Sequence, residues 1–399
     1  MTRIPFNSPP RASRELEYLG EVLRTRRISG GGKFTRACEV WLEAAIGAPR
    51  ALLTTSCTAA LEMAAMLSGV GPGDEIIMPS FTFPSTANAF VLRGATPVFV
   101  DIREDTLSID EAAIEDAING HTRAIVPMHY GGVGCNMSRI AETAKARGLV
   151  VIEDAAQALC ARRDGRPLGS FGDFAALSFH ESKNVVCGEG GALLINDPTH
   201  VDRAVIIRDK GTDRQKFMNR QVDKYSWVDI GSSYGPSEML SAFLLAQLEE
   251  AEAITARRRA AWDRYHEMLE DMEEAGGLRR PIIPHAAEHN AHIYYVLMHD
   301  AEQQSRALSR LAELEIGATF HYFPLHQAAA GRRFGKVSGS LANTEELAPR
   351  LIRLPLYADI TLDDQMRVVR ALGLVLGRRK RPHNPLRAPR RRVLARRGS

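Results

Sequence analysis

Short apolar runs alternate with helical patterns along the chain from about Phe34 to Leu194. The apolar runs predict strands at 75–78, 97–100, 124–128, 149–153, 175–179 and 192–195, with helices at 59–68, 111–117 and 137–147. Strands that alternate with helices form crossover units, which place the strands parallel in one sheet with helices on both faces. The sequence therefore predicts an α/β fold whose large domain contains a mainly parallel sheet.

A different pattern follows this region. Ser237 is a suitable N-cap for a long helix that runs to about Ala275. Beyond it we expect a strand at 291–297, a helix at 302–315, an extended piece at 318–323 and a closing helix at 361–376. These elements indicate a smaller C-terminal α/β domain. The expected division is an N-terminal arm (1–33) that packs with the small domain, a large domain (34–250), the small domain (251–377) and a basic tail (378–399).

The net charge of +3 is unevenly distributed along the chain. Residues 378–399 contain ten Lys or Arg and no acid, which leaves about −7 on the remainder. Because the tail also contains prolines, we expect it to be disordered. Such a tail is either an arm for nucleic acid or anionic lipid, or simply solvated. It lacks the interleaved aromatic residues that stack on single-stranded bases, so no nucleic-acid partner is expected.

The cysteines and the apolar content limit the compartment. The five cysteines are Cys38, Cys57, Cys135, Cys160 and Cys187. Their odd number and scattered spacing indicate reduced thiols rather than disulfides or a zinc site. No apolar window is long enough to span a membrane, and residues 1–10 do not resemble a secretory signal. We expect a cytoplasmic protein with no membrane partner and no metal.

Two charged residues follow neighbouring predicted strands. Asp154 directly follows the predicted strand at 149–153. It therefore lies at the carboxyl end of a parallel strand, where ligands of parallel sheets bind. Lys183 follows the next strand in Ser-Phe-His-Glu-Ser-Lys, before the glycine-rich turn 188–191. A lysine amine can bond covalently to an aldehyde cofactor, and a carboxylate beside a pyridine nitrogen keeps that ring an electron sink. Alone, Asp154 fits a helix cap and Lys183 a surface loop; together they indicate one cofactor site.

A third segment has the chemistry of a phosphate site. Leu-Leu-Thr-Thr-Ser56-Cys-Thr58 breaks from an apolar run into small hydroxyl residues and then into a helical pattern. The start of a helix presents free N–H groups to an anion, although Ser and Thr are also common there as simple caps. Phe83 is a candidate for stacking on a cofactor ring, whereas Phe81 is better explained by core packing. Phosphate site, lysine and carboxylate are far more specific together than separately.

These segments carry a resemblance to a known family. Ser-Cys-Thr (56–58), Pro-Ser-Phe-Thr-Phe (79–83), Glu-Asp-Ala-Ala-Gln (153–157), Ser-Phe-His-Glu-Ser-Lys-Asn (178–184) and Gly-Glu-Gly-Gly (188–191) occur in this order. The chain thereby resembles the DegT/StrS sugar-nucleotide aminotransferases, which are fold-type-I enzymes dependent on pyridoxal 5′-phosphate (PLP). The likeness runs from Ile4 to about Leu376. Within the family it is greatest to the branch that forms dTDP-4-amino-4,6-dideoxygalactose, in segments such as 222–234 and 320–326.

The resemblance assigns roles to residues of this chain. Lys183 would hold PLP covalently and move the proton, and Asp154 would pair with the ring nitrogen. The other implied cofactor contacts are Gln157 at the ring hydroxyl, Phe83 stacked on the ring, and Cys57, Thr58 and Ser178 at the phosphate. Family members are homodimers with shared sites, and Ser226 stands where a neighbour's Asn commonly reaches the phosphate. The Ser226 side chain can donate one hydrogen bond but is shorter than that of Asn. Lys33, His321, Tyr322 and His326 would line the sugar end.

The implied reaction is amination of a nucleotide-linked 4-keto-6-deoxy sugar with glutamate as donor. The expected conversion is dTDP-4-keto-6-deoxy-D-glucose to dTDP-4-amino-4,6-dideoxy-D-galactose. Family members that dehydrate sugars carry His where this chain has Lys183, so dehydration is not expected. The PLP motifs leave open a 3-keto sugar or a UDP- or GDP-linked one. A PLP-binding regulatory protein is a more distant alternative, and no helix-turn-helix pattern supports it.

Overall fold

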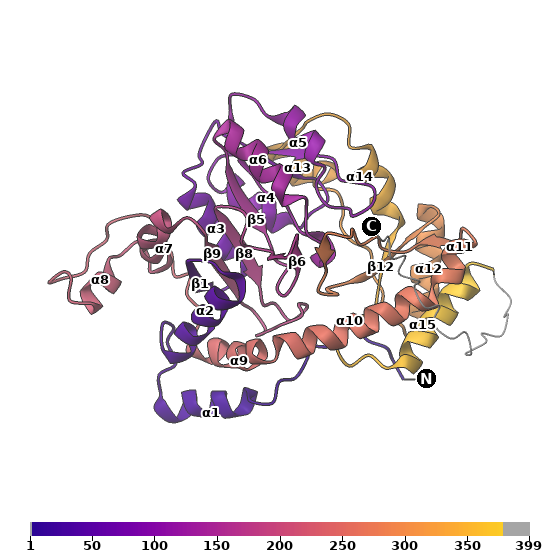
Figure 1. Ribbon diagram of the computed structural model, residues 1–399, viewed down its shortest axis with the longest axis horizontal. Helices are drawn as coiled ribbons and strands as arrows, with labels where there is room; N and C mark the ends of the chain where they lie inside the picture. The colour runs from indigo at the N-terminus through magenta and orange to yellow at the C-terminus, as the bar shows by residue number, and fades with distance from the viewer. Residues whose placement is uncertain (1, 378–399) are drawn as a thin grey trace, which may run out of the picture.

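The computed structural model describes residues 2–377, which are built around an eight-stranded sheet (Figure 1). In spatial order its strands are β1 (Arg50–Thr54), β9 (Gly191–Ile195), β8 (Phe174–Ser178), β5 (Val150–Asp154), β4 (Thr122–Ile125), β2 (Glu75–Pro79), β3 (Thr96–Val100) and β13 (Lys336–Val337). The pairs that β9 forms with β1 and β8 are antiparallel, and the other five pairs are parallel. The predicted α/β fold with a mainly parallel sheet is confirmed. The predicted basic tail lies outside the described residues.

Helices cover both faces of the sheet. One face carries α3 (Cys57–Leu67), α4 (Pro84–Val91) and α7 (Val201–Arg208), and the other carries α2 (Lys33–Ile46), α5 (Glu111–Ala117) and α6 (Met137–Arg147). Successive strand residues point to opposite faces, so Leu193 packs with α3 while Leu194 packs with α2. Strands covered on both faces are apolar throughout, which is why their sequence runs are continuous.

The C-terminal part has its own sheet and core. The antiparallel strands β10 (Leu278–Arg279), β12 (Tyr294–Met298) and β14 (Leu351–Leu354) pack against α10 (Ala251–Met268), α12 (Ala301–Glu313) and α15 (Leu362–Val375). Val296, Leu311 and Val368 are fully buried between them. The extended piece expected at 318–323 forms no strand and makes a single bridge, between Thr319 and Arg353.

The long helix expected from Ser237 to Ala275 is three helices. Ser237 is the predicted N-cap of α9 (Glu238–Glu249), α10 follows, and α11 (Glu270–Glu274) begins after Leu269. The break at Glu250 coincides with a tertiary contact, because its carboxylate accepts hydrogen bonds from the nitrogen and hydroxyl of Ser13. We propose the domain boundary at this break, since α9 packs in the core of the large sheet and α10 in the C-terminal core.

Other segments do not follow a simple two-part division. In the N-terminal arm, Ile4 pairs with Ile316 as expected, but α1 (Glu15–Thr25) lies along α9 of the large domain, where the Tyr18 hydroxyl donates to Glu249 (2.8 Å; Figure 1). Strand β13 returns from the C-terminal part to the edge of the large sheet. The remaining strands and α-helices are β6 (Arg162–Arg163), β7 (Arg166–Pro167), β11 (Ala287–Glu288), α8 (Arg214–Met218), α13 (Ala329–Phe334) and α14 (Ala342–Leu347).

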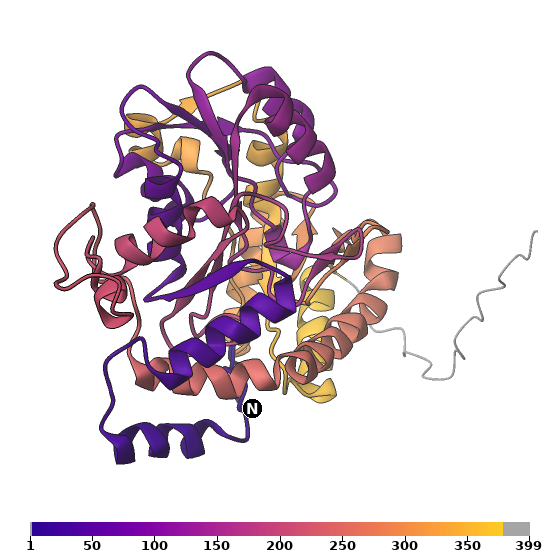
Figure 2. The ribbon, with the colours of Figure 1, turned by 60° about the vertical axis from the view of Figure 1, so that its left-hand side comes forward.

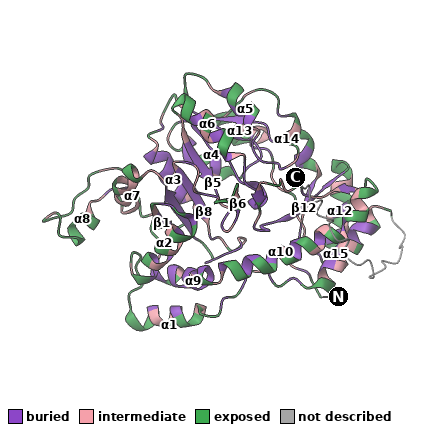
Figure 3. Ribbon diagram, in the orientation of Figure 1, coloured by how far each residue is buried: buried purple, intermediate pink, exposed green. Residues whose placement is uncertain are grey.

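The segment 213–230, which contains α8, projects from the body (Figures 1 and 2). Its surface is mostly exposed (Figure 3), including large apolar side chains such as Trp227, which is 80% exposed. Within residues 2–377, the helices are all too short or too polar to cross a membrane.

Candidate active site

A cavity of about 580 Å³ opens at the sheet edge where β5 and β8 end. Its volume is in the range of small-molecule sites. The cavity lining contains nine of the residues that the sequence assigns to a site: Cys57, Thr58, Phe83, Asp154, Gln157, Ser178, Lys183, His321 and Tyr322. Residues that are far apart in the chain thus meet in one place.

Asp154 is the last residue of β5 and is 4% exposed. The Thr86 hydroxyl donates to its Oδ2 (2.6 Å), and the Ala156 nitrogen donates to its Oδ1 (3.2 Å). Thr86 is itself hydrogen-bonded to the Thr82 hydroxyl (2.8 Å). These donors fix the orientation of the carboxylate.

Lys183 lies in the turn after β8. The Lys183 nitrogen donates to the His180 carbonyl (2.9 Å), and the Glu181 nitrogen donates to the Gly188 carbonyl (2.9 Å), which closes the turn. Burial lowers the pKa of the Lys183 amine; the Cys57 and Asp154 groups oppose this shift. A lowered pKa increases the fraction of neutral amine, which is the form that acts as nucleophile and base.

The anion site is the N-terminus of α3. Ser56 caps the helix by accepting from the Ala59 nitrogen (3.1 Å), and the first N–H groups of a helix have no intrahelical partner. Gly191 of β9 packs against this turn, and a Cβ there would collide with the Cys57 nitrogen and the Ser56 backbone. The absence of a side chain at Gly191 therefore allows the sheet edge and the helix start to meet. The Thr58 hydroxyl also lies at this end and donates to Ser85 (2.8 Å).

An aromatic wall faces these groups. Gln157 accepts from the Gly131 nitrogen (2.7 Å) and donates to the Tyr322 hydroxyl (2.8 Å). His321 contacts Tyr130, with 3.1 Å between its Nδ1 and the hydroxyl. Burial lowers the pKa of His321 well below its usual range, so this imidazole is neutral at pH 7. Phe83, at the cavity mouth, is 56% exposed.

Three of the predicted site residues do not line this cavity. Lys33 is exposed and forms an ion pair with Glu21 (2.8 Å). His326 is held by Ser80, at 2.7 Å from its Nδ1, and by Glu345. Ser226 is exposed on the projecting segment, where its nitrogen donates to Asp213 (2.6 Å). A role for Ser226 requires a second subunit and stays a prediction, as do the sugar contacts of Lys33 and His326.

The structure adds residues that the sequence reasoning missed. Arg353 and His292 line the cavity, and Thr86 supports Asp154 from outside it. Arg353 had a recognisable signal, because it is a charged residue within the apolar run Leu-Ile-Arg-Leu of β14. His292 and Thr86 had none, since their importance depends on the partners that tertiary packing gives them.

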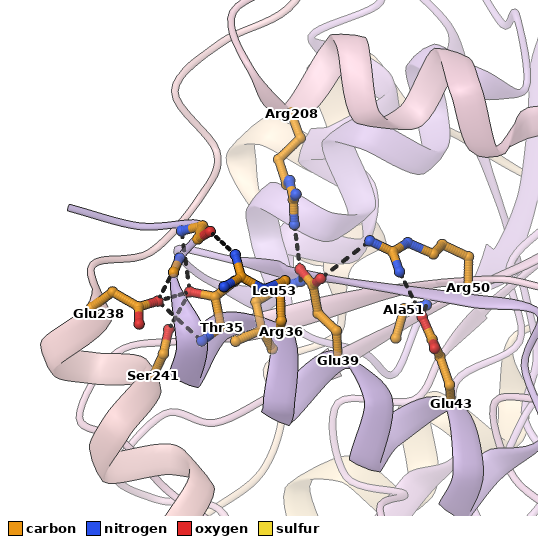
Figure 4. Close-up of polar contacts among 12 residues, drawn as sticks. Thr35, Arg36, Glu39, Glu43, Arg50, Ala51, Leu53, Arg208, Glu238 and Ser241 are labelled. Carbon is orange, nitrogen blue, oxygen red and sulfur yellow. Dashed lines mark hydrogen bonds and ion pairs between the residues drawn. The ribbon is translucent and has the colours of Figure 1, made fainter. Parts of the chain in front are cut away.

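Two buried carboxylates fix the helices behind the site (Figure 4). Glu238 of α9 accepts hydrogen bonds from the nitrogens of Gly32, Phe34 and Thr35 and from the Thr35 hydroxyl, which holds the start of α2. Glu39 of α2 bonds Arg208, Arg50 and the Leu53 nitrogen. The second contact ties α2 to β1, the strand that leads into the anion site.

The donor set fits PLP. A helix start suits the phosphate, a lysine amine of lowered pKa suits the aldehyde carbon, and a fixed carboxylate suits the ring nitrogen. Among residues 2–377 there is no cluster of three or more His, Cys, Asp or Glu that could bind a metal ion.

Comparison with known proteins agrees with this geometry. Residues 10–373 match the model of the DegT/DnrJ/EryC1/StrS aminotransferase family. The spore coat polysaccharide biosynthesis protein SpsC of Bacillus subtilis is 33% identical over 379 residues, which cover 92% of this chain and 96% of SpsC. The aminotransferase TlmJ of Streptoalloteichus hindustanus has a TM-score of 0.87 at 30% identity, over 94% of this chain and 99% of TlmJ. For Spr1654 of Streptococcus pneumoniae in its PLP form, the TM-score is 0.86 at 26% identity, over 94% and 99% of the two chains.

Proposed function

The chain belongs to the DegT/DnrJ/EryC1/StrS aminotransferase family, and we propose that its reaction is the amination of dTDP-4-keto-6-deoxy-D-glucose by glutamate. It is a PLP-dependent sugar aminotransferase. The proposed product is dTDP-4-amino-4,6-dideoxy-D-galactose. The observation that supports amination is the meeting of Lys183, Asp154 and the start of α3 in one cavity.

Each of these groups has a defined task in the proposal. Bound PLP supplies the electron sink that makes the α-proton of an amino acid removable. The start of α3, with Cys57 and Thr58, binds the phosphate and fixes the register of the ring. Lys183 Nζ takes the α-proton from the donor and later returns a proton to the sugar carbon. Asp154, oriented by Thr86, holds the proton on the ring nitrogen.

The choice of sugar rests on segments outside the PLP motifs. The resemblance to the dideoxygalactose-forming branch includes 29–36, 222–234 and 320–326. Of these, the structure puts Phe320, His321 and Tyr322 in the cavity lining. The second candidate is another nucleotide keto sugar, with the keto group at carbon 3 or a UDP or GDP carrier. The PLP motifs are common to both candidates, and SpsC, which is 33% identical, is named only for spore coat polysaccharide biosynthesis.

We also propose a homodimer with shared sites. The projecting segment 213–230 exposes Phe217, Met218, Tyr225, Trp227 and Val228, an unusual number of apolar side chains for a monomer surface. Contact with a second copy would cover them and bring Ser226 to the partner's phosphate site. Localisation in the cytoplasm is likewise an expectation from the sequence.

The substrate proposal is tested with purified protein, PLP, glutamate and a panel of nucleotide keto sugars. We expect turnover with dTDP-4-keto-6-deoxyglucose and none with the Lys183→Ala variant. Proton NMR of the product then fixes its configuration, because an axial amine at carbon 4 gives a small coupling between the protons on carbons 3 and 4. A large coupling would indicate the glucose configuration. Turnover only with a different sugar would replace the substrate.

A further inference from the structure

Arg353 lies in the middle of β14, between the buried residues Ile352 and Leu354. Its backbone is held by two hydrogen bonds to Thr319: its nitrogen donates to the Thr319 carbonyl (2.7 Å), and its carbonyl accepts from the Thr319 nitrogen. Since side chains alternate along a strand, Ile352 and Leu354 point into the C-terminal core and Arg353 points away from it. The side chain thereby reaches the cavity that contains Lys183.

The Arg353 guanidinium has no counter-charge in the described chain. Among residues 2–377 no Asp or Glu lies within 4.0 Å of its nitrogens, and its Nε is buried without a hydrogen-bond partner. The acids of the cavity lining, Asp154 and Glu189, therefore do not neutralise it. The guanidinium packs instead on the Phe6 ring, at 4.8 Å from the guanidinium carbon to the ring centroid.

An unpaired buried cation is costly, so its partner is normally supplied by the fold. Arg258 is fully buried and donates its Nε and Nη2 to the carbonyls of Ala291 and His292, whereas the partly buried Arg353 has no such acceptors for its Nε. The side chains that interact with Arg353 supply no negative charge: Tyr130 and Tyr322 are phenols, burial lowers the pKa of His292 well below its usual range, and Lys183 and Arg258 are bases. What is missing from this end of the cavity is an anion.

We infer that Arg353 binds the α-carboxylate of the amino donor, which deepens the proposed function and rests on it for the identity of that donor. The nitrogen and the α-carboxylate of an amino acid are attached to one carbon. A donor whose nitrogen takes the place of Lys183 Nζ therefore brings its carboxylate to the walls of this cavity. The planar guanidinium matches a carboxylate through two parallel hydrogen bonds.

The first test measures binding without turnover. Cofactor-free protein is titrated calorimetrically with phosphopyridoxyl-L-glutamate, phosphopyridoxyl-L-alanine and phosphopyridoxyl-4-aminobutyrate; only the last lacks an α-carboxylate. We expect Arg353→Gln to weaken the first two about 10- to 150-fold, the effect of a lost hydrogen bond to a charged group, and the third by less than threefold. Arg353→Lys, which keeps the charge, should lie between. Equal weakening of all three adducts would overturn the inference.

The second test separates the two halves of the reaction. Loss of the PLP absorbance after mixing with glutamate reports the donor half, and mixing the pyridoxamine-phosphate form with keto sugar reports the other half. Arg353→Gln should slow only the donor half. Arg350→Gln, a matched control whose side chain bonds Met298 and Glu346 outside the cavity, should slow neither. Slowing of the sugar half alone would assign Arg353 to the nucleotide sugar instead. Inactivity of the wild type toward the proposed sugar would refute the substrate but leave the donor test intact.

Discussion

The hydrogen bond from Thr86 to Asp154 is the contact on which the orientation of the ring-facing carboxylate most depends. Replacing Thr86 with Val keeps the shape of the side chain and removes the hydroxyl that lies 2.6 Å from Asp154 Oδ2. A hydrogen bond to a charged group contributes about 1.5–3 kcal/mol, which corresponds to roughly 10- to 150-fold in an equilibrium or rate constant. The Ala156 nitrogen still holds the other oxygen. We therefore expect the Thr86→Val substitution to lower kcat/KM for glutamate by roughly 10- to 150-fold.

Two matched variants isolate this contact. Thr86→Ser keeps a hydroxyl at the same position and should retain activity within about threefold. Thr82→Val removes the neighbouring bond to Thr86 but leaves the donor to Asp154 in place, so it should also remain active. Thermal unfolding of all three, followed by circular dichroism, excludes a general loss of structure. The reasoning is refuted if Thr86→Val folds normally and matches the wild type in kcat/KM and in PLP affinity.

Three further predictions concern the anchor, the subunit contact and the tail. Borohydride should fix PLP to the peptide that contains Lys183, and labelling of another lysine such as Lys210 would contradict the assignment. Ser226→Ala should weaken PLP retention by about 10-fold or somewhat more, because one hydrogen bond to a charged phosphate is lost; a fully active monomer in gel filtration would exclude a shared site. A chain ending at Gly377 should keep its kcat with free nucleotide sugar, since the cavity lining lies between Ser56 and Arg353. A large drop in kcat would place 378–399 near the site.

The large sheet and the centre of the site were predictable from the sequence. Buried parallel strands leave continuous apolar runs, and the residues that follow them must gather at one sheet edge, so the strand pattern alone places Asp154 and Lys183 together. The helix start at Cys57 was predictable for a similar reason, because caps are local.

Features that depend on distant partners were not predictable. The expected long helix breaks at Glu250, where Glu250 accepts a hydrogen bond from Ser13. Ser13 lies in the N-terminal arm, more than two hundred residues earlier in the chain. The segment 318–323 lies beside β14, the edge strand of its sheet, but pairs with it only at the bridge between Thr319 and Arg353, so it forms no strand. The hydrogen bond from Thr86 to Asp154 likewise forms only when α4 packs beside β5, which no local sequence pattern indicates.

The cavity takes one wall from the large sheet and another from β14, so residues nearly three hundred positions apart must meet to form it. Each wall packs on a separate hydrophobic core, and neither part of the chain contains the whole site. Contacts between residues so distant in sequence form late in folding, because closing long loops costs chain entropy before it is repaid. A ligand that touches both walls, such as PLP joined to the amino donor that we assign to Arg353, therefore binds the docked arrangement and not its separate halves. At a free concentration of about one hundred times its dissociation constant, such a ligand adds about 2.7 kcal/mol to the stability of the docked state. The supply of cofactor and donor together thus stabilises the docked fold of this chain as well as feeding its reaction.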